Sequence, residues 1–330
     1  MTDKKYIFII NPISFTNKPE LDIIINKLNS LFEFNQDNLH IYISKFPRDA
    51  IATIHRLIGQ LPPNVKARVY AVGGDGILFD CLNGVVGLPN VELGALPYGN
   101  SNDFTRAFGE DAFEPFRDLE AQIAGLSLPT DVIYCGNNYA INTCTIGMES
   151  YATHKAISLH NNYRRLIENS PRPLGRFLYN LLYFLGGVFS IKNQAIINQK
   201  YQITIDDQDF SGHYAIINIA NGPCYGGDKS GAVAAMPNDG LLDVVLFKST
   251  GIFNFISKGL DYLYGKYYKY PELISYHRAK EIVVRSEMPL VLQLDGEVFL
   301  DTMIKVKIIP KAIKFISVHN MTYKRRAELT

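Results

Sequence analysis

A glycine-rich turn with an acid at its centre occurs in the segment VYAVGGDGILFD, residues 69–80. A short apolar run ends at Gly73 and Gly74, Asp75 and Gly76 follow, and the pattern of a helix begins directly after them. Glycines in such a turn let backbone N–H groups approach a phosphate closely, and the helix N-terminus adds a favourable dipole. Asp75 would repel that anion unless a Mg²⁺ ion or a hydroxyl proton lies nearby. The alternative is a tight turn that only caps a helix.

A second turn with the same strand–turn–helix layout occurs in LGALPYGNSNDFTRAFG, residues 93–109. Gly99 permits an unusual backbone conformation there. The side chains that offer amide and hydroxyl groups to a nucleotide are those of Asn100, Ser101 and Asn102. Asp103 lies in the first turn of the predicted helix, where a capping role is the alternative.

Three shorter segments add polar groups. Asn11–Phe15, NPISF, follows the first predicted strand and is expected at the same ligand-binding edge. Pro237–Asp243, PNDGLLD, is typical of a turn that enters a strand. Asp295 and Glu297, in LQLDGEVF, place two carboxylates on either side of a glycine. Each segment alone is most often a plain turn, so the functional prediction depends on their combination.

The first 130 residues alternate predicted strands and helices. The apolar patterns predict strands over 5–10, 39–44, 68–72 and 91–96, and helices over 20–32, 48–58, 77–86 and 103–108. Repeated units of this length indicate a parallel sheet covered by helices. Ligands of such sheets bind at the C-terminal ends of the strands.

After about residue 132 the pattern changes to strands with few helices between them, which predicts an antiparallel β-rich domain. These strands are expected over 139–145, 201–206, 213–220, 241–247, 280–285 and 290–294. The stretch 151–191 is the exception, because it carries several arginines and then the apolar run FLYNLLYFLGGVF. That run is too short and too interrupted to span a bilayer. A core helix and a face that meets membrane lipid are the two interpretations.

Composition and charge exclude some classes of protein. The 33 basic and 32 acidic residues give a net charge of +1, which argues against a strongly basic nucleic-acid binder. The four cysteines have neither zinc-finger nor CxxC spacing, so buried, reduced thiols are expected. The N-terminal apolar run is too short for a signal peptide, which predicts a cytoplasmic chain.

Taken in order, the motifs NPxS, GGDG, PxGxxNDF, DGLLD and DGE resemble the bacterial diacylglycerol kinase and sphingosine kinase family of lipid kinases. The resemblance covers nearly the whole chain. It implies an α/β nucleotide-binding domain with a parallel sheet over residues 1–132, to which 312–330 return. It further implies an antiparallel β-rich lipid-binding domain over 133–311, with the active site in the cleft between the domains.

The resemblance also assigns nucleotide-binding positions. The family's ATP contacts fall at Asn11, Pro12, Ile13, Ser14, Phe15, Ser44, Gly74, Asp75, Gly76, Ile77, Leu78, Phe79, Asp80 and Asn100. The two glycine turns described above add Gly73, Gly99 and Asn102 to this set.

Catalytic roles follow from the same resemblance. Glu297 falls where the family has a proposed proton acceptor, and Asp295 lies beside it. Asp75 matches an acid implicated in catalysis or in magnesium and water networks. Glu297 and Asp75 remain alternatives for the base that accepts the hydroxyl proton, and either could instead hold magnesium.

Metal-binding roles are implied at a second group of residues. Asp239 matches an aspartate that binds a structural Mg²⁺ together with the backbone carbonyl groups at the positions of Met236 and Leu241. Asp103 and Asp131 match acids of the magnesium and water networks.

The chain departs from the family pattern at three nucleotide-binding positions. The family usually has Gly at the position of Phe15 and Thr at the positions of Ile77 and Asn100. Two lost hydroxyl groups imply fewer phosphate contacts, and hence weaker binding of ATP or a different nucleotide. The acids that carry the chemistry are retained, so an active enzyme is still expected.

The prediction is therefore a kinase that uses ATP and Mg²⁺ to phosphorylate the hydroxyl group of diacylglycerol or a related lipid. It would work in the cytoplasm and transiently at a peripheral membrane surface. The alternatives are a catalytically silent lipid- or nucleotide-binding protein and an NAD kinase-like enzyme, which shares the glycine–aspartate turn but lacks the NPxS and DGLLD elements. The sequence identifies neither the lipid nor whether the chain forms a homodimer.

Overall fold

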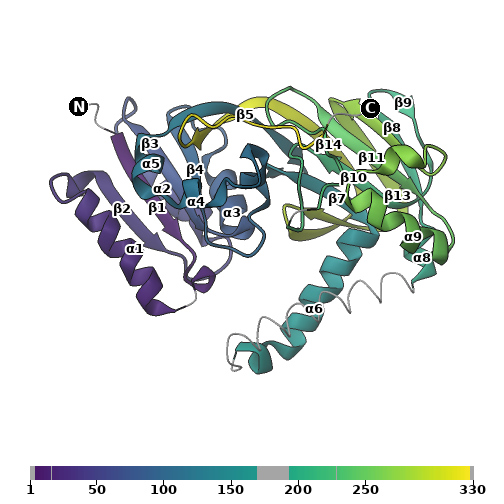
Figure 1. The fold of residues 1–330 in the computed structure, drawn as a ribbon, viewed down its shortest axis with the longest axis horizontal. Coiled ribbons are helices and arrows are strands. Elements are labelled where there is room, and N and C mark those ends of the chain that lie inside the picture. The colour runs from purple at the N-terminus through teal and green to yellow at the C-terminus, as the bar shows by residue number, and fades with distance from the viewer. Residues whose placement is uncertain (1–3, 16, 169–192, 228, 328–330) are drawn as a thin grey trace.

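The computed structural model describes residues 4–15, 17–168, 193–227 and 229–327 of the chain. Figure 1 shows two halves side by side along the long axis, an α/β half that contains the N-terminus and a strand-rich half. One sheet continues through both halves. This is the fold class that the sequence predicts.

The α/β half is built on a parallel sheet. In spatial order its strands are β2 (Leu39–Ile43), β1 (Lys4–Ile10), β3 (Lys66–Gly73) and β4 (Val91–Pro97). The end of β1 is a continuous apolar run because both of its faces are covered. Ile7 and Ile9 point into one core cluster, and Phe8 and Ile10 point into the other.

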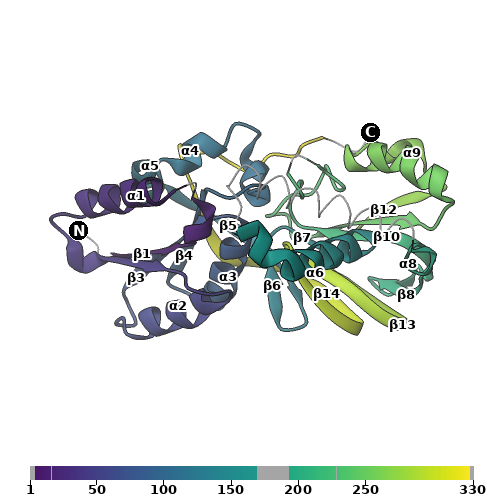
Figure 2. The ribbon, with the colours of Figure 1, turned by 90° about the horizontal axis from the view of Figure 1, so that it is seen from below.

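Helices supply the two covers (Figure 2). One face carries α1 (Lys18–Leu31) and α5 (Leu119–Ala124), and the other carries α2 (Asp49–Gly59) and α3 (Asp75–Val85). Asn17 caps α1, because its side chain accepts the N–H of Glu20 at 2.9 Å. Shorter helical turns complete this half: η1 (Pro12–Ser14), η2 (Gln36–Asn38), η3 (Asp103–Phe108) and α4 (Phe113–Arg117).

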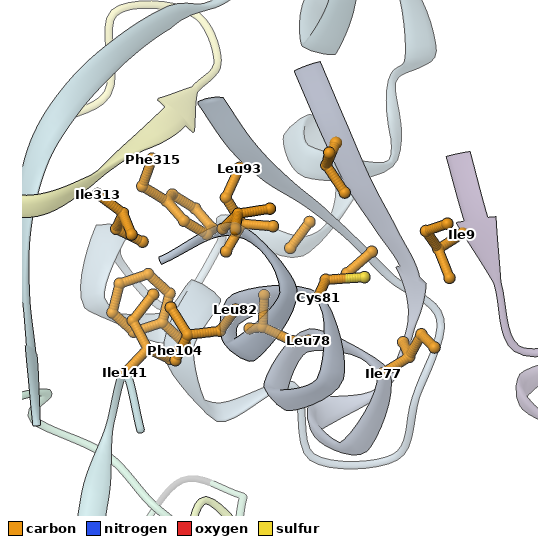
Figure 3. Packing of buried hydrophobic residues seen from close by; sticks show 14 of the residues in the cluster. Ile9, Ile77, Leu78, Cys81, Leu82, Leu93, Phe104, Ile141, Ile313 and Phe315 are labelled. Atoms are coloured by element: carbon orange, nitrogen blue, oxygen red, sulfur yellow. The ribbon is translucent and has the colours of Figure 1, made fainter. Parts of the chain in front are cut away.

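The core beneath α3 joins residues that are far apart in the sequence (Figure 3). Leu78 and Cys81 of α3 are buried with Leu93 of β4 in one cluster. The ring centroids of Phe104 and Phe315 lie 4.8 Å apart in the same cluster. Because Phe315 lies more than 200 residues after Phe104 in the sequence, this core joins distant parts of the chain.

The strand-rich half is antiparallel. Its strands are β6 (Asn138–Ala140), β7 (Thr143–Gly147), β8 (Lys200–Ile205), β9 (Gln208–Asp209), β10 (Gly212–Ala220), β11 (Leu242–Lys248), β12 (Ile274–Ala279) and β13 (Glu281–Leu294). Tyr201, Ile203 and Ile205 are buried on one side of β8, which shows the alternation of a half-buried strand. Its helices are α6 (Met148–Glu168), which projects from the sheet in Figure 1, α8 (Gln194–Ile197), α9 (Ile252–Leu263) and η4 (Tyr267–Lys269).

Two long strands connect the halves. β5 (Leu126–Cys135) pairs with β14 (Glu297–Ser317) along much of its length. β14 begins as the partner of β13 and ends in parallel with β4, where Phe315 pairs with Leu93. The last strand therefore completes the sheet of the first half.

Some elements differ from those expected. The single strand predicted over 139–145 is split into β6 and β7, because the N–H groups of Ile141 and Asn142 donate to Asp295 instead of a neighbouring strand. The two strands predicted over 280–285 and 290–294 are one strand with a register shift next to Pro289, which has no N–H to donate. The segment 103–108 is a 3₁₀ turn rather than an α-helix. The elements not predicted include β5, β12, β14, α4, α5 and α9.

The helices of the described part of the chain include none that is long and apolar enough to cross a membrane. The run FLYNLLYFLGGVF, for which a core helix or a lipid-facing segment was expected, lies outside the described residues. All four cysteines are buried free thiols, as predicted.

Candidate active site

The turns that follow β3 and β4 touch through their glycines. A Cβ atom added to Gly99 would lie 2.2 Å from the Cα of Gly74. The N–H of Gly99 donates to the carbonyl oxygen of Gly73 at 3.1 Å and to Oδ1 of Asn102 at 3.0 Å. The contact therefore requires glycine at both positions, and it aligns two strand ends at one edge of the sheet.

The loop after β1 reaches the same edge. The N–H of Asn11 donates to the carbonyl oxygen of Val72 at 3.0 Å, and its side chain accepts the N–H of Ile13 at 3.1 Å. Ser14 Oγ lies 2.9 Å from the position that a Cβ atom on Gly73 would occupy. Asn11, Ser14 and the first glycine turn are thus brought together, while the Ile13 side chain is 89 % exposed.

Other predicted nucleotide contacts divide between core and surface. Ile77 and Leu78 belong to the buried core cluster, and Phe15 is buried against Tyr98 with ring centroids 5.0 Å apart. Pro12 is half-buried at the start of η1, whereas Gly76 and Asn100 are exposed or partly exposed at the edge of the sheet. The buried side chains can position the loops but cannot themselves reach a ligand in solvent.

Ser44 and Asp80 organise the start of α2. Ser44 Oγ donates to Asp49 at 2.7 Å, and Asp80 accepts the backbone N–H of Arg48 at 2.8 Å. The Arg48 side chain also lies 3.6 Å from Asp80 and covers the ring of Phe79 at 4.6 Å. In this structure these two predicted ATP contacts bind groups of the protein itself, Ser44 the Asp49 carboxylate and Asp80 the Arg48 backbone.

Asp75 joins the two glycine turns. Its carboxylate accepts the N–H of Asn102 at 2.9 Å and the N–H of Asp103 at 2.8 Å. Burial raises the pKa of Asp75, and these two hydrogen bonds oppose the rise. The acid at the centre of the turn therefore fixes the second turn relative to the first.

Asp103 extends this connection into the strand-rich half. Its carboxylate accepts the N–H groups of Gly226 and Gly227 at 2.6 and 2.7 Å, so it does not cap its own helical turn. Burial, and then the charge of Asp75, raise the pKa of Asp103, while Arg106 lowers it. An acid from one half thus holds a glycine loop of the other half.

Glu297 faces the first glycine turn from the start of β14. Its Oε1 lies 3.7 Å from the position that a Cβ atom on Gly76 would occupy. Burial raises the pKa of Glu297, the positive charge of Arg48 lowers it, and Asp80 raises it further. A carboxyl group from the strand-rich half is therefore placed against the turn that the α/β half supplies.

The side chain of Asp295, two residues before Glu297, binds the protein backbone. Its carboxylate accepts three backbone N–H groups, from Ile141 at 2.6 Å, Asn142 at 3.0 Å and Thr143 at 2.8 Å. Its φ angle of 46° lies in the left-handed region, which Asp tolerates better than most residues. Burial raises the pKa of Asp295 to about 7, and the three N–H donors oppose this. Asp295 shapes the turn from which Glu297 projects.

Asp131 binds backbone groups where the chain crosses between the halves. It accepts the N–H of Gly240 at 2.6 Å and the N–H of Lys311 at 2.7 Å. Lys311 has a φ angle of 53° and lies within the register shift of β14. Asp131 therefore fixes the PNDGLLD segment to the bend in β14.

Asp239 does not lie in a ready-made cation site. Its carboxylate forms an ion pair with Arg278, and its other oxygen accepts the N–H of Leu241 at 3.2 Å. Met236 packs against the core of the α/β half. The guanidinium group would repel a divalent cation, so the side chains at Asp239 do not fit a structural Mg²⁺ in this arrangement.

Groups of three or more His, Cys, Asp or Glu side chains suited to a metal do not occur among the described residues. A nucleotide-bound Mg²⁺ needs no such cage, because it keeps several waters and takes one or two carboxylates plus phosphate oxygens. Asp75, Asp103 and Asp295 already accept backbone N–H groups. Glu297 is the carboxylate that faces the glycine turn.

Three contributors to this site were not predicted from the sequence. Arg48, which acts on the pKa of Glu297, carries no local motif. The positive charge of Arg106 lowers the pKa of both Asp75 and Asp103. Arg106 lies within the NDFTRAFG segment, but no role was predicted for it. The loop that contains Gly226 and Gly227 had a detectable signal in its glycine pair, but nothing in the sequence connects it to Asp103.

Comparison with known proteins adds two family matches. Residues 5–135 match the diacylglycerol kinase catalytic domain, and residues 172–317 match the YegS C-terminal NAD kinase beta sandwich-like domain. A Staphylococcus aureus (strain Mu3) protein named "Putative lipid kinase" is 28 % identical over 257 residues, which are 77 % of this chain and 78 % of that protein.

Solved structures share the fold. A diacylglycerol kinase from Bacillus anthracis aligns with a TM-score of 0.67 at 20 % identity, covering 96 % of this chain and 98 % of that chain. A second Bacillus anthracis structure, titled as a "putative diacylglycerol kinase", aligns with a TM-score of 0.70 at 22 % identity, covering 94 % and 96 %. At these identities the likeness concerns the fold alone.

Proposed function

This chain belongs to the diacylglycerol kinase and YegS-like family of lipid kinases, and we propose that it transfers the γ-phosphoryl group of ATP to the hydroxyl group of diacylglycerol or a related lipid, with Mg²⁺. The observation that carries the proposal is that acids from both halves of the structure lie at the same glycine turn. Glu297 of β14 faces Gly76, while Asp75 joins the turn of Gly76 to the turn of Gly99.

The glycine edge supports nucleotide binding. The N–H groups in the first turn of α3 lack intrahelical acceptors, as at every helix start, and they carry the positive end of the helix dipole. Gly74 and Gly76 place no side chain of their own over this turn. In the proposed complex these N–H groups bind phosphate oxygens, and Ser14 adds a hydroxyl group from the neighbouring loop.

Glu297 is the proposed base. Burial raises the pKa of Glu297, which makes it a stronger proton acceptor than an exposed glutamate. It would accept the proton of the lipid hydroxyl as the oxygen attacks the γ-phosphorus, while the bond from the γ-phosphorus to the bridging oxygen breaks and ADP leaves. Asp75 would keep the two turns in the geometry that this attack needs. Mg²⁺, when bound with the nucleotide, would neutralise part of the negative charge of the phosphates.

The test is an assay with labelled ATP, Mg²⁺ and a panel of lipid alcohols, with NAD included as a further acceptor. We expect label in a lipid product and ATP consumption that requires the lipid. Transfer of the label to NAD, which would form labelled NADP, would instead indicate an NAD kinase. Glu297→Gln should bind ATP normally and transfer at least about a hundredfold more slowly.

A catalytically silent binder is the second candidate, and one observation favours it. Ile77 stands where the family usually has Thr, and its side chain is only 4 % exposed in the core. That position offers no hydroxyl group to a nucleotide. ATP binding by calorimetry without turnover on any acceptor would support this candidate over the kinase.

A further inference from the structure

Helix α9 uses only one side for the core of the strand-rich half. Phe255 and Tyr262 are buried in a cluster with residues of β10 and β11. A separate side of the same helix carries large apolar residues that are exposed, with Phe253 at 87 %, Ile256 at 52 % and Leu260 at 62 %, and the C-cap residue Tyr264 continues this side at 58 %. Figure 2 shows α9 at the outer edge of this half.

The four exposed residues form one continuous stripe. Their spacing of three, four and four residues places them on a single helical face. Scattered exposed apolar residues need no explanation, but an aligned stripe on one helix marks an interaction surface. We call Phe253, Ile256, Leu260 and Tyr264 the α9 stripe.

The segment that carries the α9 stripe has a net positive charge. The segment 252–270 contains three lysines, Lys258, Lys266 and Lys269, against the single acid Asp261. Asp261 is already engaged, because it accepts the Tyr270 hydroxyl at 2.8 Å and lies 3.3 Å from Lys269. Tyr264 and Tyr268 are both exposed at the C-terminal end. Such tyrosines suit a boundary between an apolar phase and water.

We propose that the α9 stripe inserts into the surface of an anionic lipid bilayer. Phe253, Ile256 and Leu260 would enter the acyl boundary, and the lysines would meet the phosphates of the head groups. A second copy of this chain is a poorer partner, because its lysines in the segment 252–270 would face the same lysines of the first copy. The proposal rests on the proposed function only for its biological purpose, since a lipid substrate must be met at a bilayer.

Docking at α9 would bring the bilayer close to the loop that contains Gly226 and Gly227. The N–H of Ser230 donates to the carbonyl oxygen of Leu263 at 2.8 Å, and the hydroxyl groups of Tyr225 and Tyr262 lie 3.2 Å apart. The loop that α9 holds in this way contains the glycine pair bound by Asp103. One loop therefore connects helix α9 to Asp103 of the candidate site.

The sequence contains no Trp, which permits a direct test. Phe253→Trp would place one fluorophore in the α9 stripe, and Phe34→Trp would place one at a site that is 92 % exposed in the other half. Vesicles of phosphatidylglycerol and phosphatidylcholine, without ATP, should blue-shift the tryptophan emission of Phe253→Trp and allow its quenching by brominated acyl chains. Pure phosphatidylcholine should have a much weaker effect. An unchanged spectrum for Phe253→Trp, or equal changes for both variants, would overturn the proposal.

A charge in the α9 stripe provides the second test. Leu260→Asp should lower co-sedimentation with the anionic vesicles by about tenfold or more, whereas the matched change Phe34→Asp should leave it unchanged. Raising the salt concentration should weaken vesicle binding of the wild type, because salt screens the attraction between the lysines and the head groups. Because these measurements need no turnover, a failure of the kinase assay leaves them interpretable. A wild-type dimer that Leu260→Asp converts to a monomer would show that a second copy covers the stripe, and would overturn the proposal.

Discussion

The carboxylate of Asp75 accepts the N–H of Asp103 at 2.8 Å, while the carboxylate of Asp103 accepts N–H groups from the Gly226–Gly227 loop. Two acids thus form consecutive hydrogen-bonded links across the boundary between the halves. The first joins two turns of the α/β half, and the second attaches them to the strand-rich half. A change at Asp75 should therefore affect the geometry of the whole site.

Asp75→Asn is expected to retain the fold and to lower turnover at least about a hundredfold. An amide keeps one acceptor oxygen, but its NH₂ group faces an N–H that then loses its partner. Circular dichroism and a turnover assay on the same preparation test this. Near-normal turnover in the folded variant would remove Asp75 from the mechanism.

Glu297 should set the acid limb of the pH–rate profile. Burial raises its pKa, so kcat/KM should fall with decreasing pH at a higher pH than for an exposed glutamate, as the base becomes protonated. Glu297→Gln should abolish this limb together with at least about 99 % of the activity.

Arg48→Met offers a matched change at a neighbour of that base. Arg48 lowers the pKa of Glu297, so its removal should raise that pKa and move the acid limb to higher pH. A limb that stays in place would show that another group titrates.

Gly99→Ala tests the contact between the turns. Its Cβ atom would lie 2.2 Å from the Cα of Gly74, so the turns must separate. We expect the Kd for ATP to rise about tenfold or more, which corresponds to roughly 1.4 kcal/mol. Gly59→Ala is the control, since no atom lies within 4 Å of its added Cβ. Equal affinities in the two variants, measured by calorimetry, would place the nucleotide elsewhere.

Asp295→Ala should destabilise the fold by at least about 3 kcal/mol, because three buried N–H groups lose their acceptor. Asp295→Asn should cost less, since Asn also tolerates a positive φ and keeps one acceptor. Asp209→Ala, which removes an exposed carboxylate, should change the free energy of unfolding much less than Asp295→Ala. Urea unfolding measures all three. A stable Asp295→Ala variant with low turnover would instead make Asp295 a catalytic group.

Asp239→Ala addresses the structural metal implied by family resemblance. Because Arg278 already balances this carboxylate, we expect a loss of about 0–1 kcal/mol and the same Mg²⁺ dependence of Tm in both proteins. A larger Mg²⁺ stabilisation of the wild type would establish a cation at Asp239 in place of the ion pair.

The sequence predicts the α/β half well because its signals are local. Apolar runs that end in glycine turns define β3 and β4, and their C-terminal ends must share one edge in a parallel sheet. The strand-rich half is predicted less well. Its α9 has apolar residues on both its buried and its exposed sides, which obscures the helical period, and β13 is irregular at Pro289.

Within the site, residue types are predicted better than their partners. Two carboxylates around Gly296 are visible in the sequence, but the role of Asp295 depends on N–H groups at Ile141–Thr143, which are far away in the chain. The same limit applies to Asp103 and its glycine loop. Local pattern identifies a polar group, whereas only the fold decides which backbone it binds.

The route of β14 has a consequence for biosynthesis. Phe315 is fully buried among the aromatic rings of the α/β half, and its strand lies beside β4. While the ribosome is still making the strand-rich half, the earlier half lacks this strand and exposes the surface that Phe315 will cover. The N-terminal half therefore cannot finish folding during synthesis, and a fragment that ends near residue 132 should need chaperones or aggregate. Fusing the segment 312–327 to that fragment supplies the missing strand.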